Sequence, residues 1–212
     1  MKLYQFPPTR SLRAIWALRE LDIPCELVTV NLLAGENRDP EFLRLNPAGK
    51  LPVLVDGDVV LTESVAIVLY LAEKYPHKGL IPTDLAERAQ VYRWLLFTAT
   101  ELEQPLWRIA RHTALYPPER RLAADVSIAS EEFRAMAGVV ATHLKGREFL
   151  GKRLSAADLV LAYTLDWGNE AQLLGDQPVL LEYLERMYAR PCAPQRIAEA
   201  FASIRGNAAP SS

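Results

Sequence analysis

The sequence predicts an α/β domain followed by an all-α domain, and three observations support this prediction. The first third of the chain mixes strand and helix signals. From Asp84 onwards the strand signals vanish and helical patterns remain. Between the two parts, PHKGLIP (residues 76–82) has the proline and glycine content of a linker. We therefore expect an α/β domain over 1–78, a linker over 79–84, a helical domain over 85–205 and a disordered tail over 206–212.

The composition is that of an ordinary globular chain, with 50% hydrophobic and 24% charged residues among 212. Lys plus Arg is 24 and Asp plus Glu is 26, so the net charge of −2 favours neither nucleic acid nor an anionic membrane as a partner. No signal segment or apolar run of ~18 residues is present, so we expect a cytoplasmic protein without a membrane span. Cys25 and Cys192 fit no CxxC or metal-ligand spacing, which predicts two reduced thiols and no metal site.

The first domain begins with a strand-helix-strand pattern. Lys2–Phe6 and Cys25–Asn31 are predicted as strands, and Arg10–Leu21 as the helix between them. The helix should end before Pro24, because the residue that precedes a proline avoids the helical region. A helix between two strands in so few residues predicts that the strands pair in parallel.

A hairpin and another helix follow. In PVLVDGDVVL (residues 52–61) apolar residues flank Asp56-Gly57, which is a strong hairpin signal. The next stretch, TESVAIVLYLAEKY (residues 62–75), has the pattern of a buried helix. Together these elements predict a four-stranded mixed sheet with helices, which is a thioredoxin-like layout.

The second domain is predicted to be entirely helical. Ser155 and Asp158 stand three apart at the start of one helix, so each can bond the other's backbone N–H in a capping box. We therefore assign them a structural role. The predicted helical segments are Leu85–Ala114, Pro118–Leu144, Ser155–Glu170, Pro178–Tyr188 and Pro194–Phe201.

Two hydroxyl residues, Thr9 and Ser11, flank Arg10 at the predicted start of the first helix. They can simply cap the helix. They can also face a ligand, because a helix N-terminus presents free N–H groups and positive dipole charge. A redox protein of this layout would carry CxxC here. A hydroxyl cannot exchange thiols, but it can hold the thiolate of a ligand and lower the pKa of that thiol.

The stretch NPAGKLPVL (residues 46–54) places Pro52 at the start of a strand. A cis Leu51–Pro52 bond would turn the N–H and C=O of Leu51 outward, ready to pair with an extended peptide. The alternative is a trans proline on an edge strand. Lys50 can meet a carboxylate or remain solvated.

Glu63 and Ser64 begin the second buried helix. They can act as capping residues, or they can hold a zwitterionic amino-acid head, with Ser64 binding its carboxylate and Glu63 its ammonium. The hydroxyl turn, the x-Pro strand and this Glu-Ser start should share one edge of the sheet. Together they fit a short peptide with a thiol in the middle and a free amino acid at one end, which is glutathione.

The chain resembles the cytosolic glutathione S-transferases, including bacterial members, over nearly its whole length. The resemblance rests on NPAGKLPVL, on LTESVAIVLYLAEKYP and on LSAADLVLAY (residues 154–163), which looks like the buried capping box of that family. It implies the glutathione transferase fold, a homodimer, and glutathione as a co-substrate with no further cofactor. It also implies a glutathione site on the first domain and a variable apolar pocket against the helical domain.

The resemblance assigns glutathione-binding roles by position. Arg38 matches a basic contact to the glycine carboxylate, and Arg10 either screens the thiolate or is exposed. The roles of the other binding residues carry over directly: Lys50, Leu51, Pro52, Glu63 and Ser64.

The residue that contacts the thiol stays open between two candidates. Ser11 matches the hydroxyl of transferases with an Arg-Ser start, and Thr9 matches the position used by disulfide-reducing bacterial members. Ser11 is slightly favoured. For the electrophile pocket the candidates are Trp107, Arg108, Arg111 and Tyr116, although Trp107 also suits core packing, and His112 is expected to be a surface residue.

The predicted function is a detoxifying glutathione transferase, which activates the glutathione thiol and conjugates it to a small hydrophobic electrophile. One alternative is a glutathione-dependent disulfide reductase. Another is a non-catalytic adaptor or regulatory protein with the same fold. An intact glutathione site argues against the adaptor, because an adaptor need not keep one.

Overall fold

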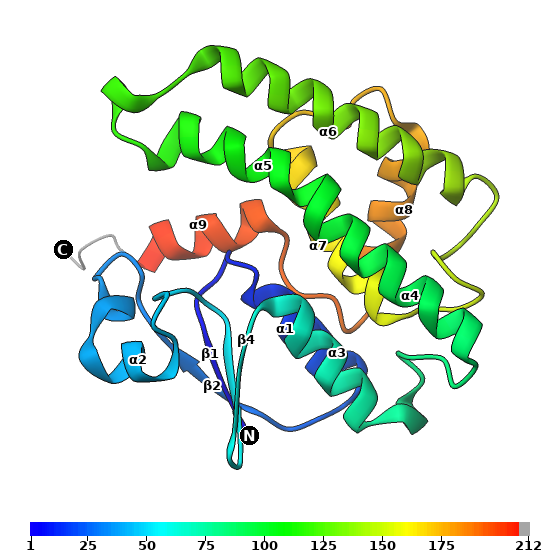
Figure 1. The fold of residues 1–212 in the computed structure, drawn as a ribbon, viewed down its shortest axis with the longest axis horizontal. Coiled ribbons are helices and arrows are strands. Elements are labelled where there is room, and N and C mark those ends of the chain that lie inside the picture. The colour runs from blue at the N-terminus through cyan, green and yellow to red at the C-terminus, as the bar shows by residue number, and fades with distance from the viewer. Residues whose placement is uncertain (208–212) are drawn as a thin grey trace. The chain divides into compact units, whose positions relative to one another are not determined.

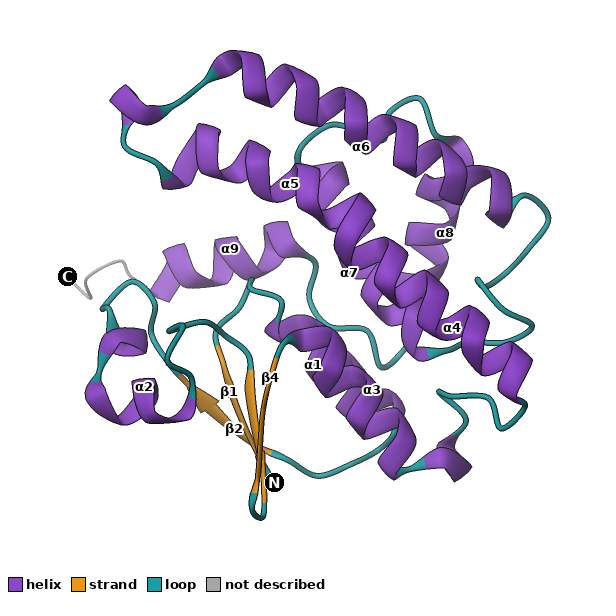
Figure 2. Cartoon of the chain, viewed as in Figure 1, coloured by secondary structure: helices purple, strands orange, loops and turns teal. Residues whose placement is uncertain are grey.

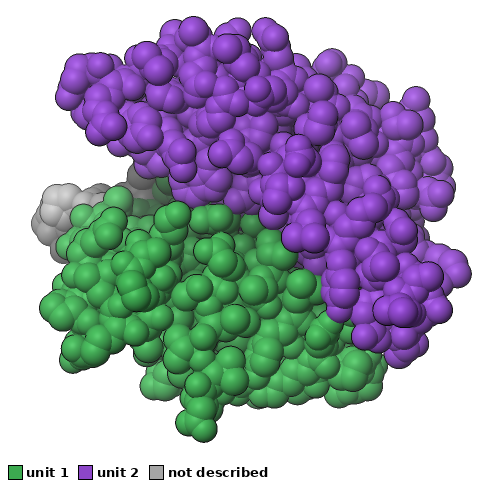
Figure 3. Space-filling view, viewed as in Figure 1, with its two compact units in different colours: residues 1–81, 191–212 green, residues 82–190 purple. Residues whose placement is uncertain are grey.

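The computed structural model describes residues 1–207, which form two compact units (Figure 3). Among the described residues, the first comprises Met1–Ile81 and residues 191–207, and the second comprises Pro82–Arg190. Residues 191–205 therefore cluster with the first unit, whereas we expected them in the helical domain.

The expected tail over 206–212 falls partly within the described chain. Helix α9, Ile197–Asn207, includes its first two residues, so these are helical. The other residues of the expected tail, 208–212, lie outside the described residues.

The first unit is built on a four-stranded mixed sheet (Figures 1 and 2). The strand order is β2-β1-β3-β4, with β1 and β2 parallel and the other neighbouring pairs antiparallel. This confirms the predicted parallel pair and hairpin. The strands are β1 Lys2–Gln5, β2 Glu26–Thr29, β3 Val53–Asp56 and β4 Val59–Thr62.

The hairpin turn lies one residue later than the sequence signal. Asp56 pairs with Val59, so the two connecting residues are Gly57 and Asp58 rather than Asp56 and Gly57. Gly57 has φ +60°. A residue with a Cβ avoids this left-handed backbone, so the glycine fixes the turn one position later.

One face of the sheet is covered by two long helices, α1 Ser11–Glu20 and α3 Ser64–Lys74 (Figure 2). Leu3 and Leu54 are register partners on β1 and β3, and both are fully buried. Eight consecutive residues of α1 are buried. The helix is therefore covered by other parts of the protein around most of its circumference.

The other face carries a second cluster of apolar side chains. Phe42 comes from α2, Pro40–Leu45, a short helix that we did not predict. It packs with Val53 of β3, and Ile204 of α9 joins the same cluster. Because side chains alternate between the faces of a strand, Val53 and its neighbour Leu54 serve opposite layers.

The second unit is helical throughout its regular elements. The predicted helix over Leu85–Ala114 is present, but one π-helical segment, Thr98–Leu102, divides it and a second, Arg111–Leu115, forms its end. The α-helices are α4 Leu85–Phe97, α5 Glu103–Ala110, α6 Ala123–Leu144, α7 Ala156–Glu170 and α8 Pro178–Tyr188.

The capping box predicted at the start of α7 is confirmed. Asp158 accepts hydrogen bonds from the backbone N–H of Ser155 at 2.9 Å and from its hydroxyl at 2.8 Å. Asp158 also accepts from the N–H of Leu150 at 2.8 Å and from the hydroxyl of Tyr183 at 3.0 Å. The carboxylate thus ties three segments of the helical unit together.

Candidate active site

The sheet brings the predicted site segments to one end of the first unit. Val53 of β3 pairs with Tyr4 of β1 on one side and with Thr62 of β4 on the other. These three paired residues lie at the same end of the sheet. The turn before α1, the residues just before β3 and the start of α3 all adjoin this end. The expected convergence on one edge is present.

The turn before α1 contains a compact network of hydroxyl groups. The hydroxyl of Thr9 donates to the carbonyl of Phe6 at 2.5 Å, and it lies 2.7 Å from the hydroxyl of Ser11. The N–H of Ser11 donates to Thr9 Oγ1 at 3.3 Å, so Thr9 helps to cap the helix. The N–H of Phe6 donates to Ser11 Oγ at 3.4 Å.

The two hydroxyl residues differ in exposure. Ser11 is 0% exposed, whereas Thr9 is half-buried. Arg10 occupies the N-cap position of α1 and is also half-buried. Of the two candidates for the thiol contact, Thr9 is therefore the one that a ligand can reach directly.

The loop before β3 is held by asparagine side chains. Asn46 donates through Nδ2 to the carbonyl of Lys50 at 2.8 Å and accepts through Oδ1 from the N–H of Ala48 at 3.1 Å. Asn37 donates to the carbonyl of Gly49 at 2.8 Å. These bonds fix the backbone that presents Lys50.

Arg38 lies against this loop. A Cβ added at Gly49 would come within 2.9 Å of Arg38 Nη1, and Gly49 has φ +63°, so only glycine suits this position. Arg38 and Lys50 are both exposed. The structure thus places the exposed Arg38 against Gly49, the residue that precedes the exposed Lys50.

The Leu51–Pro52 peptide bond is cis, as one of the two interpretations predicted. Leu51 and Pro52 are both buried. The structure also contains a cis Pro7–Pro8 bond, in the turn between β1 and the hydroxyl network, which we did not predict.

Glu63 has an unusual backbone conformation, with φ +65° and ψ 114°. Such a conformation costs on the order of 1–3 kcal/mol in a residue with a side chain, and it is found most often at functional sites. Glu63 holds the N-cap position of α3, but no described side chain forms a cap bond there. Its carboxylate is exposed. Glu63 therefore makes no side-chain cap bond, although its charge stands at the N-terminus of α3, where the helix dipole favours it.

Ser64 instead accepts a hydrogen bond from Arg13, with 3.2 Å between Nη1 and Oγ. Arg13 lies on α1 and is 1% exposed. This bond joins the starts of α1 and α3. We did not predict it, because the two bonded residues are 51 positions apart in the sequence.

In the helical unit, Trp107 and Arg111 have different surroundings. The Trp107 ring packs edge-on against Trp167 at 5.3 Å between centroids, and its N–H donates to Glu103 at 3.2 Å. Arg111 begins the second π-helical segment and is exposed. The contacts of Trp107 favour core packing, which was one of its two interpretations.

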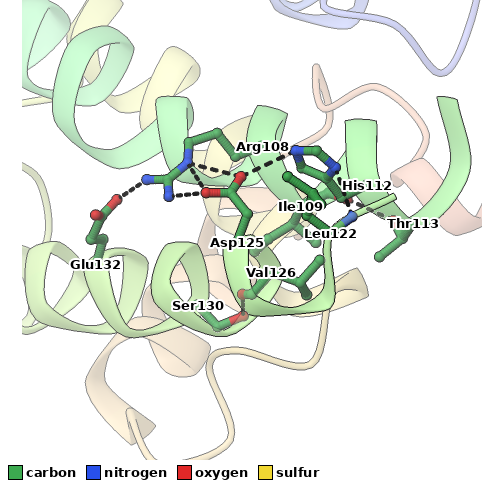
Figure 4. Close-up of polar contacts among 9 residues, drawn as sticks. All are labelled: Arg108, Ile109, His112, Thr113, Leu122, Asp125, Val126, Ser130 and Glu132. Atoms are coloured by element: carbon green, nitrogen blue, oxygen red, sulfur yellow. Dashed lines mark hydrogen bonds and ion pairs between the residues drawn. The ribbon is translucent and has the colours of Figure 1, made fainter. Parts of the chain in front are cut away.

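Arg108 is held by acidic side chains of α6 (Figure 4). Its guanidinium donates to both carboxylate oxygens of Asp125 and to Glu132. The hydrogen bond from Arg108 lowers the pKa of Asp125 and raises that of Arg108. The guanidinium therefore links α5 to α6.

The same cluster includes His112 (Figure 4). His112 Nε2 lies 3.3 Å from Asp125, and Nδ1 accepts the N–H of Leu122 at 3.2 Å. Its ring packs edge-on against Tyr116 at 5.1 Å. The side chain is 12% exposed, so the expected free surface residue is in fact part of a polar network.

Both cysteines are free, and they line one groove of about 440 Å³ in the first unit. Burial raises the pKa of the Cys25 thiol. No sequence pattern indicated that the two thiols line the same groove. The groove is lined by Ile15, Leu18, Arg19, Asp22, Ile23, Pro24, Cys25, Leu27, Pro191 and Cys192.

Among residues 1–207, no three potential ligands drawn from His, Cys, Asp and Glu gather as a metal ion would require. Over the same residues, no helix has the length and apolar character needed to cross a membrane.

The sheet order, the helices on its faces and the helical second unit define a protein with a thioredoxin-like domain and an all-α domain. Family models agree with this division. The glutathione S-transferase N-terminal domain matches residues 1–73, and the glutathione S-transferase C-terminal domain matches residues 104–191.

Individual proteins show the same relationship. Glutathione S-transferase F10 of Arabidopsis thaliana is 39% identical over 190 residues, covering 85% of this chain and 88% of that protein. Glutathione S-transferase GST-4.5 of Xanthomonas campestris pv. campestris is 33% identical, and the match covers 89% of this chain and 93% of that protein. A crystal structure of a glutathione transferase from Methylococcus capsulatus is 32% identical, with a TM-score of 0.80 over 95% of this chain and 97% of that one. The chain belongs to the glutathione S-transferase family.

Proposed function

We propose that the protein binds glutathione at the end of the sheet described above and conjugates its thiol to a small hydrophobic electrophile. One observation carries the proposal. Three ligand-binding features meet at that end within one unit: the hydroxyl turn of Thr9 and Ser11, the cis-proline strand start, and the start of α3 at Ser64.

Each part of glutathione has a partner of suitable chemistry. The backbone next to the cysteine pairs with Leu51 by strand addition. The zwitterionic head meets Ser64 and the exposed Glu63. The glycine carboxylate meets the exposed cations of Arg38, which lies against Gly49, and of Lys50, the next residue.

Thr9 is the residue that we propose to contact the sulfur, with Ser11 behind it. The burial of Ser11 supports this order, which reverses the initial preference. The Thr9 proton points to the carbonyl of Phe6, so it must rotate toward the sulfur to stabilise a thiolate. Ser11 donates to Thr9 across their 2.7 Å contact both before and after this rotation, because the single proton of Thr9 is directed elsewhere. The positive N-terminus of α1 and neighbouring Arg10 add to the stabilisation of the anion.

The catalytic contribution consists of thiolate stabilisation and positioning, and it requires no metal or further cofactor. The resemblance also implies a homodimer and an electrophile pocket with Trp107, Arg108, Arg111 and Tyr116. These two points, and a cytoplasmic location, stay predictions. The carboxylates around Arg108 make it the weakest of the four pocket candidates.

A pH titration of bound glutathione tests the proposal, with the thiolate followed by its ultraviolet absorbance. We expect the bound thiol to ionise below the ordinary cysteine pKa of about 8.5. Thr9→Ala should return the pKa of the bound thiol toward that value and sharply reduce turnover, with little loss of glutathione affinity. Ser11→Ala should have a smaller effect. Thr142→Ala is the control, because its hydroxyl also donates to a backbone carbonyl but lies on α6.

The alternatives have distinct outcomes. An unchanged thiol pKa and unchanged turnover in Thr9→Ala/Ser11→Ala would contradict the proposed role of the hydroxyls. A disulfide substrate that is turned over faster than every electrophile would indicate a glutathione-dependent reductase. An absence of glutathione binding would indicate the non-catalytic adaptor.

A further inference from the structure

A buried arginine lies directly beneath the candidate site. Arg13 is the charged residue among the eight buried residues of α1, and it is 1% exposed. Moving a guanidinium out of water costs several kcal/mol even after the protein relaxes. A methionine or leucine would fill the same space at lower cost, so the charge at this position calls for a reason beyond packing.

The bond between Arg13 and Ser64 fixes the role of the serine hydroxyl. A guanidinium carries donors only, so Ser64 Oγ must accept from Arg13 Nη1 across their 3.2 Å contact. A hydroxyl that accepts on one side keeps its own proton for another acceptor. Ser64 is 4% exposed, so this proton has few directions in which to point. Arg13 thereby makes Ser64 a dedicated donor at the start of α3.

The charges at the start of α3 are complementary to those of a zwitterionic ligand group. Arg13 places a positive charge beneath the first turn, where the helix dipole also favours an anion. One residue earlier, the exposed carboxylate of Glu63 offers a negative partner, and its strained backbone holds it outside the helix. A carboxylate and an ammonium on the same carbon match these two neighbouring sites.

We propose that Arg13 is a positioning residue for the α-carboxylate of the γ-glutamyl head. It acts through Ser64, whose hydroxyl it orients, and through its own buried charge. The inference rests on the proposed function, because it assumes that glutathione is the ligand. It adds a residue on α1 to the recognition of a ligand group at α3, and it makes the site selective for an amino acid over a simple amine.

The test compares glutathione with 4-aminobutyryl-cysteinyl-glycine, which keeps the ammonium and lacks only the α-carboxylate. Isothermal titration calorimetry gives the dissociation constant of each ligand. We expect the wild-type protein to bind glutathione at least about 10-fold more tightly than the analogue. Arg13→Met should weaken glutathione binding by about that factor and leave the affinity for the analogue nearly unchanged. Arg13→Lys should retain part of the selectivity.

Arg19→Met is the matched control, because Arg19 lies on the same helix but is exposed and donates to the carbonyl of Ala193. It should change neither affinity. If Arg13→Met weakens both ligands equally, Arg13 only supports the packing of α1 on α3, and the inference is wrong. If the wild-type protein binds neither ligand, the proposed function is wrong, and the inference is wrong with it because it assumes that glutathione binds.

A second measurement avoids dependence on a variant that does not fold. Arg13→Lys, Ser64→Ala and their double variant form a cycle in glutathione affinity. Losses that are smaller together than their sum would show that Arg13 acts through Ser64. Fully additive losses would overturn that part of the proposal.

Discussion

The starts of α3 and α7 each combine a serine with an acidic residue, but the two pairs have different hydrogen-bond partners and different exposure. At α7, Ser155 and Asp158 bond each other, and Asp158 also binds Leu150 and Tyr183. Every one of these groups is buried, and burial raises the pKa of Asp158 against the lowering effect of its hydrogen bonds. At α3, the carboxylate of Glu63 is exposed and Ser64 is bonded from beneath by Arg13.

This difference separates a structural helix start from one suited to a ligand. A carboxylate whose acceptor sites are filled by its own chain stabilises the fold and has little left for a partner. A strained, exposed acid beside an oriented hydroxyl lowers the stability of the fold, and its polar groups are left to bind a ligand. Residue type alone does not distinguish the two, since both starts pair a serine with an acid.

The largest expected effect concerns the α7 side of the comparison. Asp158→Ala removes the acceptor of several buried donors, and each buried donor without a partner costs about 1–3 kcal/mol. We expect the free energy of unfolding to fall by about 3–5 kcal/mol in urea titrations. Glu182→Ala, an exposed acid on α8, is the control and should change stability by less than about 0.5 kcal/mol. A loss of under about 1 kcal/mol for Asp158→Ala would mean that the network is not structural.

A smaller effect should separate two glycines with the same backbone conformation. Gly49 has φ +63° and Gly57 has φ +60°, so alanine at either should cost about 1–2 kcal/mol of stability. A Cβ at Gly49 would also displace Arg38, whereas one at Gly57 meets nothing within 4 Å. Gly49→Ala alone should therefore weaken glutathione binding in a calorimetric titration. Equal affinities for the two variants would remove Arg38 from the proposed site.

The smallest effect concerns the Arg108–Asp125 pair of the helical unit. Its hydrogen bond lowers the pKa of Asp125 in the folded state. The resulting stability is present above the unfolded value of about 3.9 and is lost as pH falls through the lower folded value. The melting temperature of Asp125→Asn should lie slightly below that of the wild-type protein at pH 7, and the two should converge in strong acid. A difference that persists unchanged below both pKa values would show that the pair does not act through its charge.

Much of the fold could be predicted, because local signals and sheet topology agree. The strand-helix-strand pattern, the hairpin and the capping box are all short-range features with a definite chemistry. The short helix α2 was missed, although Asp39 followed by Pro40 is a typical helix start. Its six residues gave too little periodicity to notice.

The candidate site could be predicted only where the local sequence indicates what its residues do. The cis bond at Pro52 and the Glu63-Ser64 start carry such signals. Arg13 carries no such signal, because nothing in the sequence around it indicates that its guanidinium is buried. Its burial depends on the packing of α1 against α3, which no local pattern contains. The different exposures of Ser11 and Thr9 are likewise set by the turn between β1 and α1, which no local pattern contains.

The most direct test of the account compares Ser64→Ala with Ser155→Ala, with calorimetric glutathione titrations and urea unfolding performed on both. Ser64→Ala should lower glutathione affinity about 10-fold with a modest change in stability. Ser155→Ala should lower stability by about 1–2 kcal/mol and leave glutathione affinity unchanged. Equal effects of both substitutions on affinity, or an affinity loss only in Ser155→Ala, would contradict the assignment of the α3 start to the ligand.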